Sequence, residues 1–206
     1  MIKSAMVRLS PDLIKSRFCL DATEPAPAPG LLPAGVLVPL FFADGEPQML
    51  LTQRTWNLKD HRGQIAFPGG VRDPEDPHLL ATAIRETQEE IGLNPEAVEV
   101  LGSLEPVSTV TGYWINPYPA LIPYPYKFTP NRREVKRLIF VRLEEFLDPP
   151  RWSTRLYEFK GQRVWVCYFQ YGKTLIWGAT ARIILEFLTR LGENPLEGGQ
   201  DATCLD

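Results

Sequence analysis

Cysteine and long apolar runs are both scarce in this sequence, and each scarcity excludes a class of protein. Three cysteines, an odd number, are spread widely over 206 residues, at Cys19, Cys167 and Cys204. That spacing forms neither a disulfide framework nor a zinc motif, so we expect free thiols in a reducing compartment. The chain has no run of about 18 apolar residues and no signal-peptide core at its start. We therefore expect a soluble cytoplasmic protein without a membrane partner.

An excess of positive charge is also missing. Lys and Arg number 22 against 25 Asp and Glu, which gives a net charge of −3. Such a chain has no general attraction for nucleic acid, so nucleic acid is not expected as a partner. Any affinity for phosphate must come from a few well-placed cations or from a bound metal ion.

The length favours one domain, and a hydrophobic fraction of 44% is sufficient for a core. We expect residues 1–206 to form a single domain. Ser10-Pro11-Asp12 has the pattern of a helix start, and a proline-rich linker follows, so residues 1–33 are assigned to a short helix and a linker. Residues 193–206 are polar and glycine-rich and are expected to form a flexible tail.

Runs of β-forming residues alternate with two helical segments. A helical period predicts helices over residues 79–91, ending at Gly92, and 176–191. Asp44-Gly45 predicts a tight turn between the first two strands. Strands are expected at residues 36–42, 48–53, 98–104, 115–124, 140–143, 157–159 and 164–169. Strands interrupted by one central and one terminal helix indicate an α/β/α sandwich with a mixed sheet.

The central predicted helix concentrates carboxylates on one edge. Glu86 and Glu90 are four residues apart and Glu86 and Glu89 are three apart, so all three are helical neighbours. Like charges so close destabilise a helix unless a cation lies among them, and hard oxygen ligands suit Mg²⁺ or Mn²⁺. Arg85 precedes Glu89 by four residues and can pair with it, which would fix its orientation.

A glycine turn precedes this helix. Two adjacent glycines in Phe67-Pro68-Gly69-Gly70 permit a tight turn and let a backbone carbonyl, that of Gly70, reach a metal ion. An isolated RExxEE string is usually only a solvated helix face. The glycine turn and the charged helix together favour a metal site beside a bound diphosphate.

The whole string from residue 67 to residue 93 resembles the Nudix box of the Nudix hydrolase superfamily. The matching positions are Gly70, Arg85, Glu86, Glu89, Glu90, Gly92 and Leu93. Asp76 stands where the family has glutamate, and Thr87 replaces an aliphatic residue. Eight residues, rather than seven, separate Asp76 from Arg85. The resemblance implies a Nudix-type fold and metal-dependent hydrolysis of a nucleoside diphosphate.

Residues upstream of the box look like the signature of the coenzyme A pyrophosphatase branch of that superfamily. That signature begins at Leu50-Leu51-Thr52-Gln53-Arg54-Thr55 and continues through Lys59, Gly63 and the glycine turn. Thr55 replaces Ser or Ala, and Lys59 replaces Arg. This branch commonly has the longer spacing, and the segment 176–181 resembles its late IWGxTA motif. The resemblance implies a small-molecule substrate of the coenzyme A type, split into 3′,5′-ADP and 4′-phosphopantetheine.

The same resemblance assigns roles to individual residues. Metal ligation falls to Glu86, Glu89 and Glu90 with the Gly70 carbonyl, and the three glutamates with Arg85 form the catalytic group. Substrate contacts are expected from Arg54, Lys59, Arg62 and Gly69. The general base is left open among Glu86, Glu134 and Glu158. Adenine stacking is considered for Trp56, Tyr113 and Trp114, although each is more often a packing residue.

Two other functions remain open at this point. One is a different Nudix specificity, for ADP-ribose or a dinucleotide. The other is a non-catalytic Nudix-fold sensor, which the retention of all three box carboxylates argues against. The sequence also leaves open whether the chain forms a homodimer.

Overall fold

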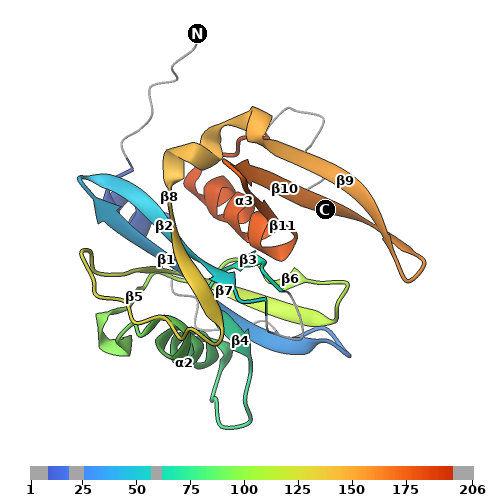
Figure 1. The fold of residues 1–206 in the computed structure, drawn as a ribbon, viewed down its shortest axis with the longest axis horizontal. Helices are drawn as coiled ribbons and strands as arrows, with labels where there is room; N and C mark the ends of the chain where they lie inside the picture. The colour runs from blue at the N-terminus through green and yellow to red at the C-terminus, as the bar shows by residue number, and fades with distance from the viewer. Residues whose placement is uncertain (1–8, 19–25, 57–61, 197–206) are drawn as a thin grey trace.

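Two sheets, one large and one small, frame the molecule in this computed structural model, which describes residues 9–18, 26–56 and 62–196 (Figure 1). The large sheet has the order β3-β2-β1-β7-β5, with β4 paired to β1, β6 to β7 and β8 to β2. Its strands are β1 Leu32–Ala43, β2 Glu46–Arg54, β3 Ile65–Ala66, β4 Gly69–Val71, β5 Glu99–Val100, β6 Val107–Ser108, β7 Tyr113–Leu121 and β8 Val135–Arg142. The small sheet, in the order β11-β10-β9, comprises β9 Trp152–Phe159, β10 Gln162–Tyr171 and β11 Thr174–Trp177.

The large sheet is mixed, as the sequence predicts. β1 and β7 run parallel, with Ala34 opposite Ile115, and the other pairings in this sheet are antiparallel. The helices of the described chain are α1 Pro11–Ser16, α2 Leu79–Ile91 and α3 Ala179–Leu191, with 3-10 turns η1 Pro95–Ala97, η2 Leu143–Leu147 and η3 Pro149–Arg151. α2 and α3 lie on opposite sides of the large sheet (Figure 1). The α/β/α prediction is therefore confirmed.

Strand β1 is buried on both faces, which explains its continuous apolar sequence. Leu37 and Phe41 belong to the core cluster that contains the α2 residue Leu79. Val38 and Leu40, which alternate with them, belong to the larger cluster with α1, α3 and the small sheet. Successive side chains on a strand point to opposite faces, so one apolar run supplies both cores.

The β1–β2 turn is formed as predicted. Ala43 is opposite Glu46, so Asp44 and Gly45 alone make the connection. Their φ angles are 53° and 81°, and a type I′ hairpin turn requires both central residues at positive φ. Asp and Gly are residues that tolerate this conformation.

Several predicted boundaries are wrong. β1 begins at Leu32, inside the expected linker, and β8 begins at Val135, five residues before the predicted start at 140. Only Glu99–Val100 of the predicted strand 98–104 is formed. The last helix starts at Ala179 rather than 176, because residues up to Trp177 form β11. β3, β4 and β6 are two or three residues long and carry no readable period.

Two expectations about the chain's ends and thiols also need correction. Leu196, within the predicted flexible tail, is 6% exposed and belongs to the main core, while residues 197–206 lie outside the described part. Cys167 is disulfide-bonded rather than free; Cys19 and Cys204 lie outside the described residues. Among the described residues, no helix has the length and apolar character needed to cross a membrane.

Candidate active site

Helix α2 lies directly on β1 because Gly35 has no side chain. A Cβ at this position would overlap the backbone oxygen of Leu79 and come within 3.1 Å of the Ala83 nitrogen. Gly35 is also paired with Gly70 of β4. The helix and the glycine turn are thus fixed on the same strand.

The ends of α2 are defined by local chemistry. His78 is the N-cap, and its Nδ1 accepts a hydrogen bond of 3.1 Å from the Ala81 backbone nitrogen. Gly92, at a φ of 69°, ends the helix in the left-handed conformation, as predicted. Residues 85–90 therefore occupy the second half of a well-bounded helix.

The glycine turn meets the helix at its carboxylates. A Cβ on Gly70 would lie 2.5 Å from the Glu86 carboxylate, so that carboxylate packs against the bare backbone. Gly69 has a φ of 150°, which favours glycine, and its backbone N–H donates to Glu90. Both glycines are required for this close approach.

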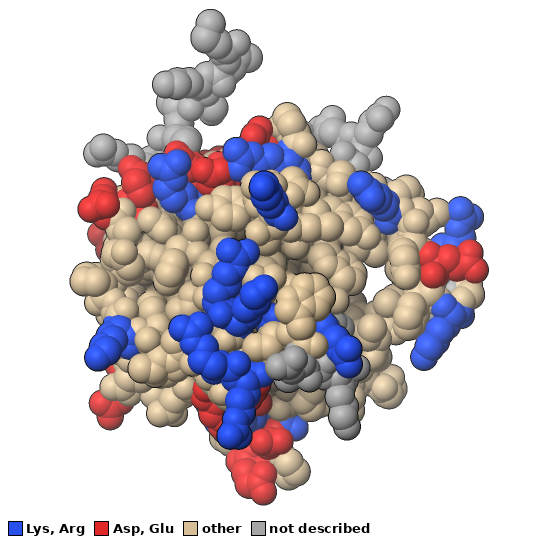
Figure 2. Space-filling model, in the orientation of Figure 1, with Lys and Arg blue, Asp and Glu red and all other residues tan. Residues whose placement is uncertain are grey.

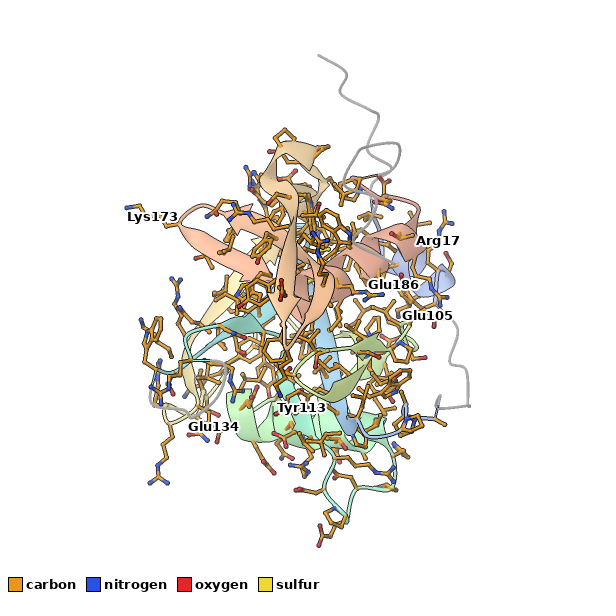
Figure 3. The ribbon with its side chains drawn as sticks, turned by 90° about the vertical axis from the view of Figure 1, so that its right-hand side faces the viewer. Arg17, Glu105, Tyr113, Glu134, Lys173 and Glu186 are labelled. Atoms are coloured by element: carbon orange, nitrogen blue, oxygen red, sulfur yellow. The ribbon has the colours of Figure 1, made fainter. Side chains whose placement is uncertain are left out.

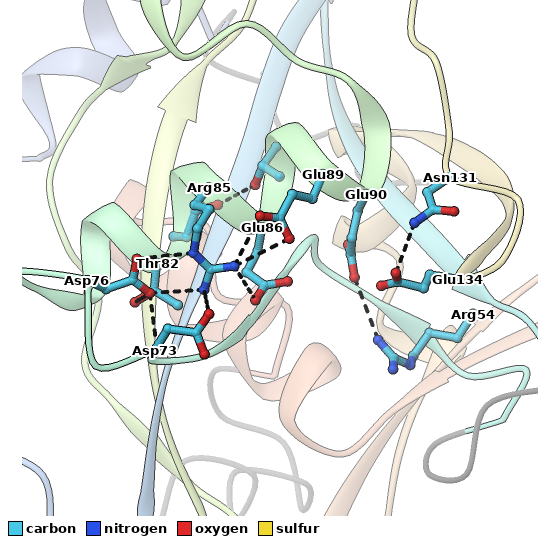
Figure 4. Close-up of polar contacts among 12 residues, drawn as sticks. Arg54, Asp73, Asp76, Thr82, Arg85, Glu86, Glu89, Glu90, Asn131 and Glu134 are labelled. Carbon is cyan, nitrogen blue, oxygen red and sulfur yellow. Dashed lines mark hydrogen bonds and ion pairs between the residues drawn. The ribbon is translucent and has the colours of Figure 1, made fainter.

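Arg85 is the hub of the acidic residues (Figure 4). Its Nη1 lies 2.9 Å from Glu86 Oε1 and 3.4 Å from Glu89 Oε2. Its Nε and Nη2 donate to the two carboxylate oxygens of Asp76, at 3.1 and 2.9 Å. Asp73 adds a longer contact of 3.5 Å. Arg85 therefore pairs with Glu89 as predicted, but its main partner is Asp76.

Asp76 is a buried anchor for this hub. Besides Arg85, its Oδ2 accepts from Thr82 Oγ1 at 2.9 Å and from the Asp73 backbone nitrogen at 3.1 Å. The hydrogen bond from Arg85 is the main cause that holds the pKa of Asp76 well below its usual range. Asp76 also raises the pKa of Arg85 above its ordinary value. Both groups of the pair are therefore charged at neutral pH.

Glu90 and Arg54 form a second, sparser pair. Glu90 is 3% exposed, and its Oε1 lies 3.6 Å from Arg54 Nη1. Glu90 Oε2 and Arg54 Nε are buried without any hydrogen-bond partner among the described residues. Burial raises the pKa of Glu90 to about 8, and Arg54 opposes this rise. Unpaired buried polar atoms are costly, so these two atoms are poised to bind an added ligand.

Glu134 lies near the helix carboxylates Glu86 and Glu90 although it comes from a distant part of the chain (Figure 4). Asn131 Nδ2 donates to Glu134 Oε1 at 2.9 Å, and the Glu134 backbone oxygen accepts from the Thr55 nitrogen at 2.8 Å. Burial is the main cause that raises the pKa of Glu86, and the charge of Glu134 adds to it. Three acidic side chains, from Glu86, Glu90 and Glu134, thus influence one another.

These groups open into a cavity of about 640 Å³, within the range of small-molecule sites. Arg54, Glu86, Glu90 and Glu134 line it together with the glycine turn. Its remaining walls come from β1, β3, β6, β7, β10, β11 and the start of α3. The cavity therefore extends from the charged helix edge to the small sheet.

Basic residues lie on both sides of Glu134 in the chain. Arg132, Arg133, Lys136 and Arg137, all exposed, flank Glu134 in the chain. On the face shown in Figure 2, Lys and Arg gather near the middle, whereas Asp and Glu lie mainly toward the edges. A chain with a net charge of −3 thus has a locally basic surface, as phosphate binding requires.

The structure brings together most, but not all, of the predicted site residues. Lining the cavity are Arg54, Gly69, Gly70, Glu86, Glu90 and, of the aromatic candidates, Tyr113. Glu89 is turned away, with a side chain 58% exposed. Other predicted residues that do not line it are Arg85, Arg62, Trp56, Trp114 and Glu158. Lys59 lies outside the described residues.

Several residues of this site were missed from the sequence. Thr82 and Asp73 hold the Asp76–Arg85 pair, and Arg163 and Trp165 line the far side of the cavity. The position of Asp76 six residues before Thr82 was the only local signal for the first group. No local pattern marks the second group, because β10 reaches the cavity only through the fold.

The carboxylates at the cavity fit a hard divalent cation whose other ligands are water and substrate oxygens. As they stand, the described residues hold no cluster of three His, Cys, Asp or Glu side chains grouped as a metal cage. Glu89 instead contacts Arg85 at 3.4 Å, and its side chain is exposed. Glu86 and the unpaired Glu90 Oε2 remain at the cavity. Mg²⁺ typically uses one or two carboxylates, several waters and substrate phosphates, which this arrangement can supply.

Comparisons with known proteins agree with this geometry. The NUDIX domain family model matches residues 31–168. A protein of Cronobacter sakazakii, described as "Uncharacterized Nudix hydrolase NudL", is 40% identical over 164 residues, covering 79% of this chain and 84% of that protein. A Klebsiella pneumoniae protein with the same description is 39% identical over 190 residues, covering 91% and 97%. The crystal structure of a MutT/nudix family protein from Enterococcus faecalis has a TM-score of 0.51 and 16% identity, covering 89% of this chain and 70% of that one, which indicates a shared fold.

Proposed function

The chain belongs to the Nudix hydrolase family, and on that premise we propose that it hydrolyses the diphosphate bond of coenzyme A or its derivatives. The products are 3′,5′-ADP and (acyl-)4′-phosphopantetheine. One observation carries the proposal. Arg54, from the upstream segment that resembles the coenzyme A signature, lies 3.6 Å from the box residue Glu90 in the shared cavity. The segment that suggests the substrate and the helix that suggests the chemistry therefore meet at one point.

The metal ligands follow from the positions of the carboxylates. Glu86 and Glu90 line the cavity and would hold the ion with the Gly70 carbonyl as a further oxygen donor, and Glu89 would join them on leaving Arg85. Bound Mg²⁺ or Mn²⁺ supplies charge neutralisation and a lower pKa for the attacking water. Arg85, held by Asp76, is a positioning residue because it fixes the orientation of the helix carboxylates.

The remaining chemistry belongs to the chain's own side chains. Arg54 Nε has no partner in the described residues, and a guanidinium is suited to bind a diphosphate through two hydrogen bonds. Water attacks one phosphorus, a new P–O bond forms, and the bond to the bridging oxygen breaks. Glu134 accepts the proton of that water, since one of its oxygens is held by Asn131 and it faces the cavity.

The choice of Glu134 as the base is tested by the variant Glu134→Gln. General-base loss typically reduces rate by about 10²–10⁴-fold, so kcat should fall by that amount with little change in the unfolding temperature. Glu158→Gln is the matched control, because Glu158 is exposed and does not line the cavity. Equal activity of the two variants would remove Glu134 from the mechanism.

The substrate is tested by a panel of coenzyme A, ADP-ribose and NADH with Mg²⁺ or Mn²⁺, with the products identified by mass. Coenzyme A should give the highest kcat/KM, and its products should be 3′,5′-ADP and 4′-phosphopantetheine. Higher kcat/KM with ADP-ribose or NADH would replace this assignment with that other Nudix specificity. Glu89→Gln and Glu90→Gln should abolish turnover, whereas Glu105→Gln, distant in sequence and exposed, should not. Unchanged turnover in the first two would overturn the metal site.

A further inference from the structure

The inner face of the β9–β10 hairpin continues past the core and over the cavity. Phe169 and Cys167 of β10 are buried in the main core. Trp165 and Arg163 follow them at intervals of two residues and therefore lie on the same face of the strand. Both residues line the cavity whose other end carries Glu86 and Glu90 (Figure 1 shows the hairpin extending from the body).

Trp165 is an exposed aromatic residue that faces inward. It is 52% exposed although its strand face is the one that buries Cys167 and Phe169 nearby. Trp165 lines the cavity, so its exposed side chain is available to a bound molecule there. The outer side has its own exposed aromatic, Tyr157, which pairs with Val164 and does not line the cavity.

The two ends of the cavity differ in chemistry. The charged end holds Arg54, Glu86, Glu90 and Glu134, which would bind the diphosphate and its metal ion. The lining away from these groups includes the apolar side chains of Val107, Val110 and Ala179 and the polar side chains of Thr109, Thr111 and Thr180. The cavity is thus larger than the scissile diphosphate, and its second end suits a planar, weakly polar group.

Arg163, like Arg182, adds a cation to this part of the lining. Glu158 is its register partner on β9, but among the described residues no carboxylate forms an ion pair with Arg163. Residues two apart on a strand are separated by about 7 Å along it, so one ligand that spans that distance can meet both side chains. Charge complementarity therefore favours an anionic group next to the planar one.

We propose that Arg163 and Trp165 form a subsite for the phosphorylated nucleoside end of the substrate, in which the base stacks on Trp165 and Arg163 binds the phosphate on the ribose. This assignment rests on the proposed function, because it is coenzyme A that carries such a phosphate. Aromatic rings bind any base by its face, and Arg binds phosphate through two hydrogen bonds. The pair thus distinguishes a 3′-phosphorylated nucleotide from one without that phosphate.

Binding of the product half tests the subsite without turnover. In calorimetric titrations without metal, 3′,5′-ADP should bind more tightly than 5′-AMP to the full-length protein. Trp165→Ala should weaken both nucleotides by roughly five- to a hundredfold, as expected for loss of base stacking. Arg163→Ala should weaken 3′,5′-ADP by about tenfold and bring it close to 5′-AMP, as expected for loss of a charge-assisted hydrogen bond.

Matched controls lie on the same sheet. Tyr157→Ala removes an aromatic side chain of similar exposure, 54% against 52%, from the opposite face of the hairpin. Lys173→Ala removes an exposed cation from the β10–β11 turn, which does not line the cavity (Figure 3). Both controls should bind like the unaltered protein. If Trp165→Ala and Arg163→Ala also bind like it, the subsite is overturned.

Kinetics separate this inference from the proposed function. With Mg²⁺ or Mn²⁺, Arg163→Ala should raise KM for coenzyme A but not for 3′-dephospho-coenzyme A, with kcat nearly unchanged. Failure of the unaltered protein to cleave coenzyme A would reject the proposed function, and the titrations would still report on the nucleotide subsite. If the protein cleaves coenzyme A but Arg163→Ala changes KM equally for coenzyme A and 3′-dephospho-coenzyme A, only the subsite is rejected. If Trp165→Ala impaired cleavage only of coenzyme A thioesters with long acyl chains, the subsite would also be rejected, because Trp165 would then contact the acyl chain.

Discussion

Replacement of Asp76 by alanine tests whether the Asp76–Arg85 pair holds the catalytic helix in place. Asp76 is 7% exposed and accepts hydrogen bonds from Arg85, from Thr82 and from the Asp73 backbone. The variant leaves these donors without their acceptor. It also releases the end of Arg85 that does not contact the helix carboxylates.

The expected loss in the free energy of unfolding is about 3 kcal/mol. Removal of one partner of a buried ion pair typically costs roughly 3–5 kcal/mol. The lower end applies here, because the Arg85 side chain is 27% exposed and keeps its contact with Glu86. Asp73→Asn is the matched control: its side chain is 61% exposed, its contact with Arg85 is 3.5 Å long, and its cost should stay below about 0.5 kcal/mol.

The effect should depend on pH in a defined direction. Hydrogen bonding to Arg85 lowers the pKa of Asp76 in the folded state below its unfolded value of about 3.9. A lowered folded pKa contributes stability above the unfolded pKa, and that stability is lost as pH falls toward the folded pKa. The difference between the unaltered protein and Asp76→Ala should therefore be constant from about pH 7 to pH 5 and shrink below about pH 4.

Urea unfolding followed by tryptophan fluorescence, at pH 7, 5 and 3.5, measures these differences. The reasoning fails if Asp76→Ala and Asp73→Asn cost the same at pH 7. It also fails if the cost of Asp76→Ala is the same at pH 3.5 as at pH 7, since the charge on Asp76 would then contribute nothing.

Two further perturbations address the position of the helix and the buried carboxylate. Gly35→Ala should destabilise the protein by about 3 kcal/mol or more in urea unfolding, because the added methyl overlaps the Leu79 backbone, which cannot rotate away as a side chain can. A cost below about 1 kcal/mol would show that α2 is free to shift. Glu90→Gln should abolish hydrolysis yet change the stability of the metal-free protein by less than about 1 kcal/mol, since burial already favours the uncharged form of Glu90. In thermal unfolding it should also lose the stabilisation that Mn²⁺ gives the unaltered protein; retention of that shift would contradict its role as a ligand.

The parts of the fold that could be predicted are those determined by near neighbours in the chain. α2 was predicted over residues 79–91 because its period, its length and its terminal Gly92 are all local. The Asp44-Gly45 turn is local in the same way. β3 and β6, two residues each, exist only because β2 and β7 pair with them, so no pattern in their own residues announces them.

The same distinction applies to the site. The spacing of Glu86, Glu89 and Glu90 identified the carboxylate cluster, but not which of them faces the cavity. That choice depends on how α2 packs on β1, which buries Glu90 and leaves Glu89 exposed. Glu134 and Trp165 reach the cavity through pairings of β8 and β10. A single sequence does not reveal such long-range pairings.

The parallel pairing of β1 with β7 has a consequence for how the protein folds. Ala34 pairs with Ile115, and Gln48 of β2 pairs with Arg142 of β8, so each strand of the first hairpin lacks one of its long neighbouring strands until late in synthesis. Closing such long loops costs entropy before any contact compensates for it, and exposed apolar strands aggregate meanwhile. α2 can form early as a helix, but the cavity beside it is complete only after β7 and β10 have been made. Chains truncated before β8 should therefore collect as insoluble, inactive protein.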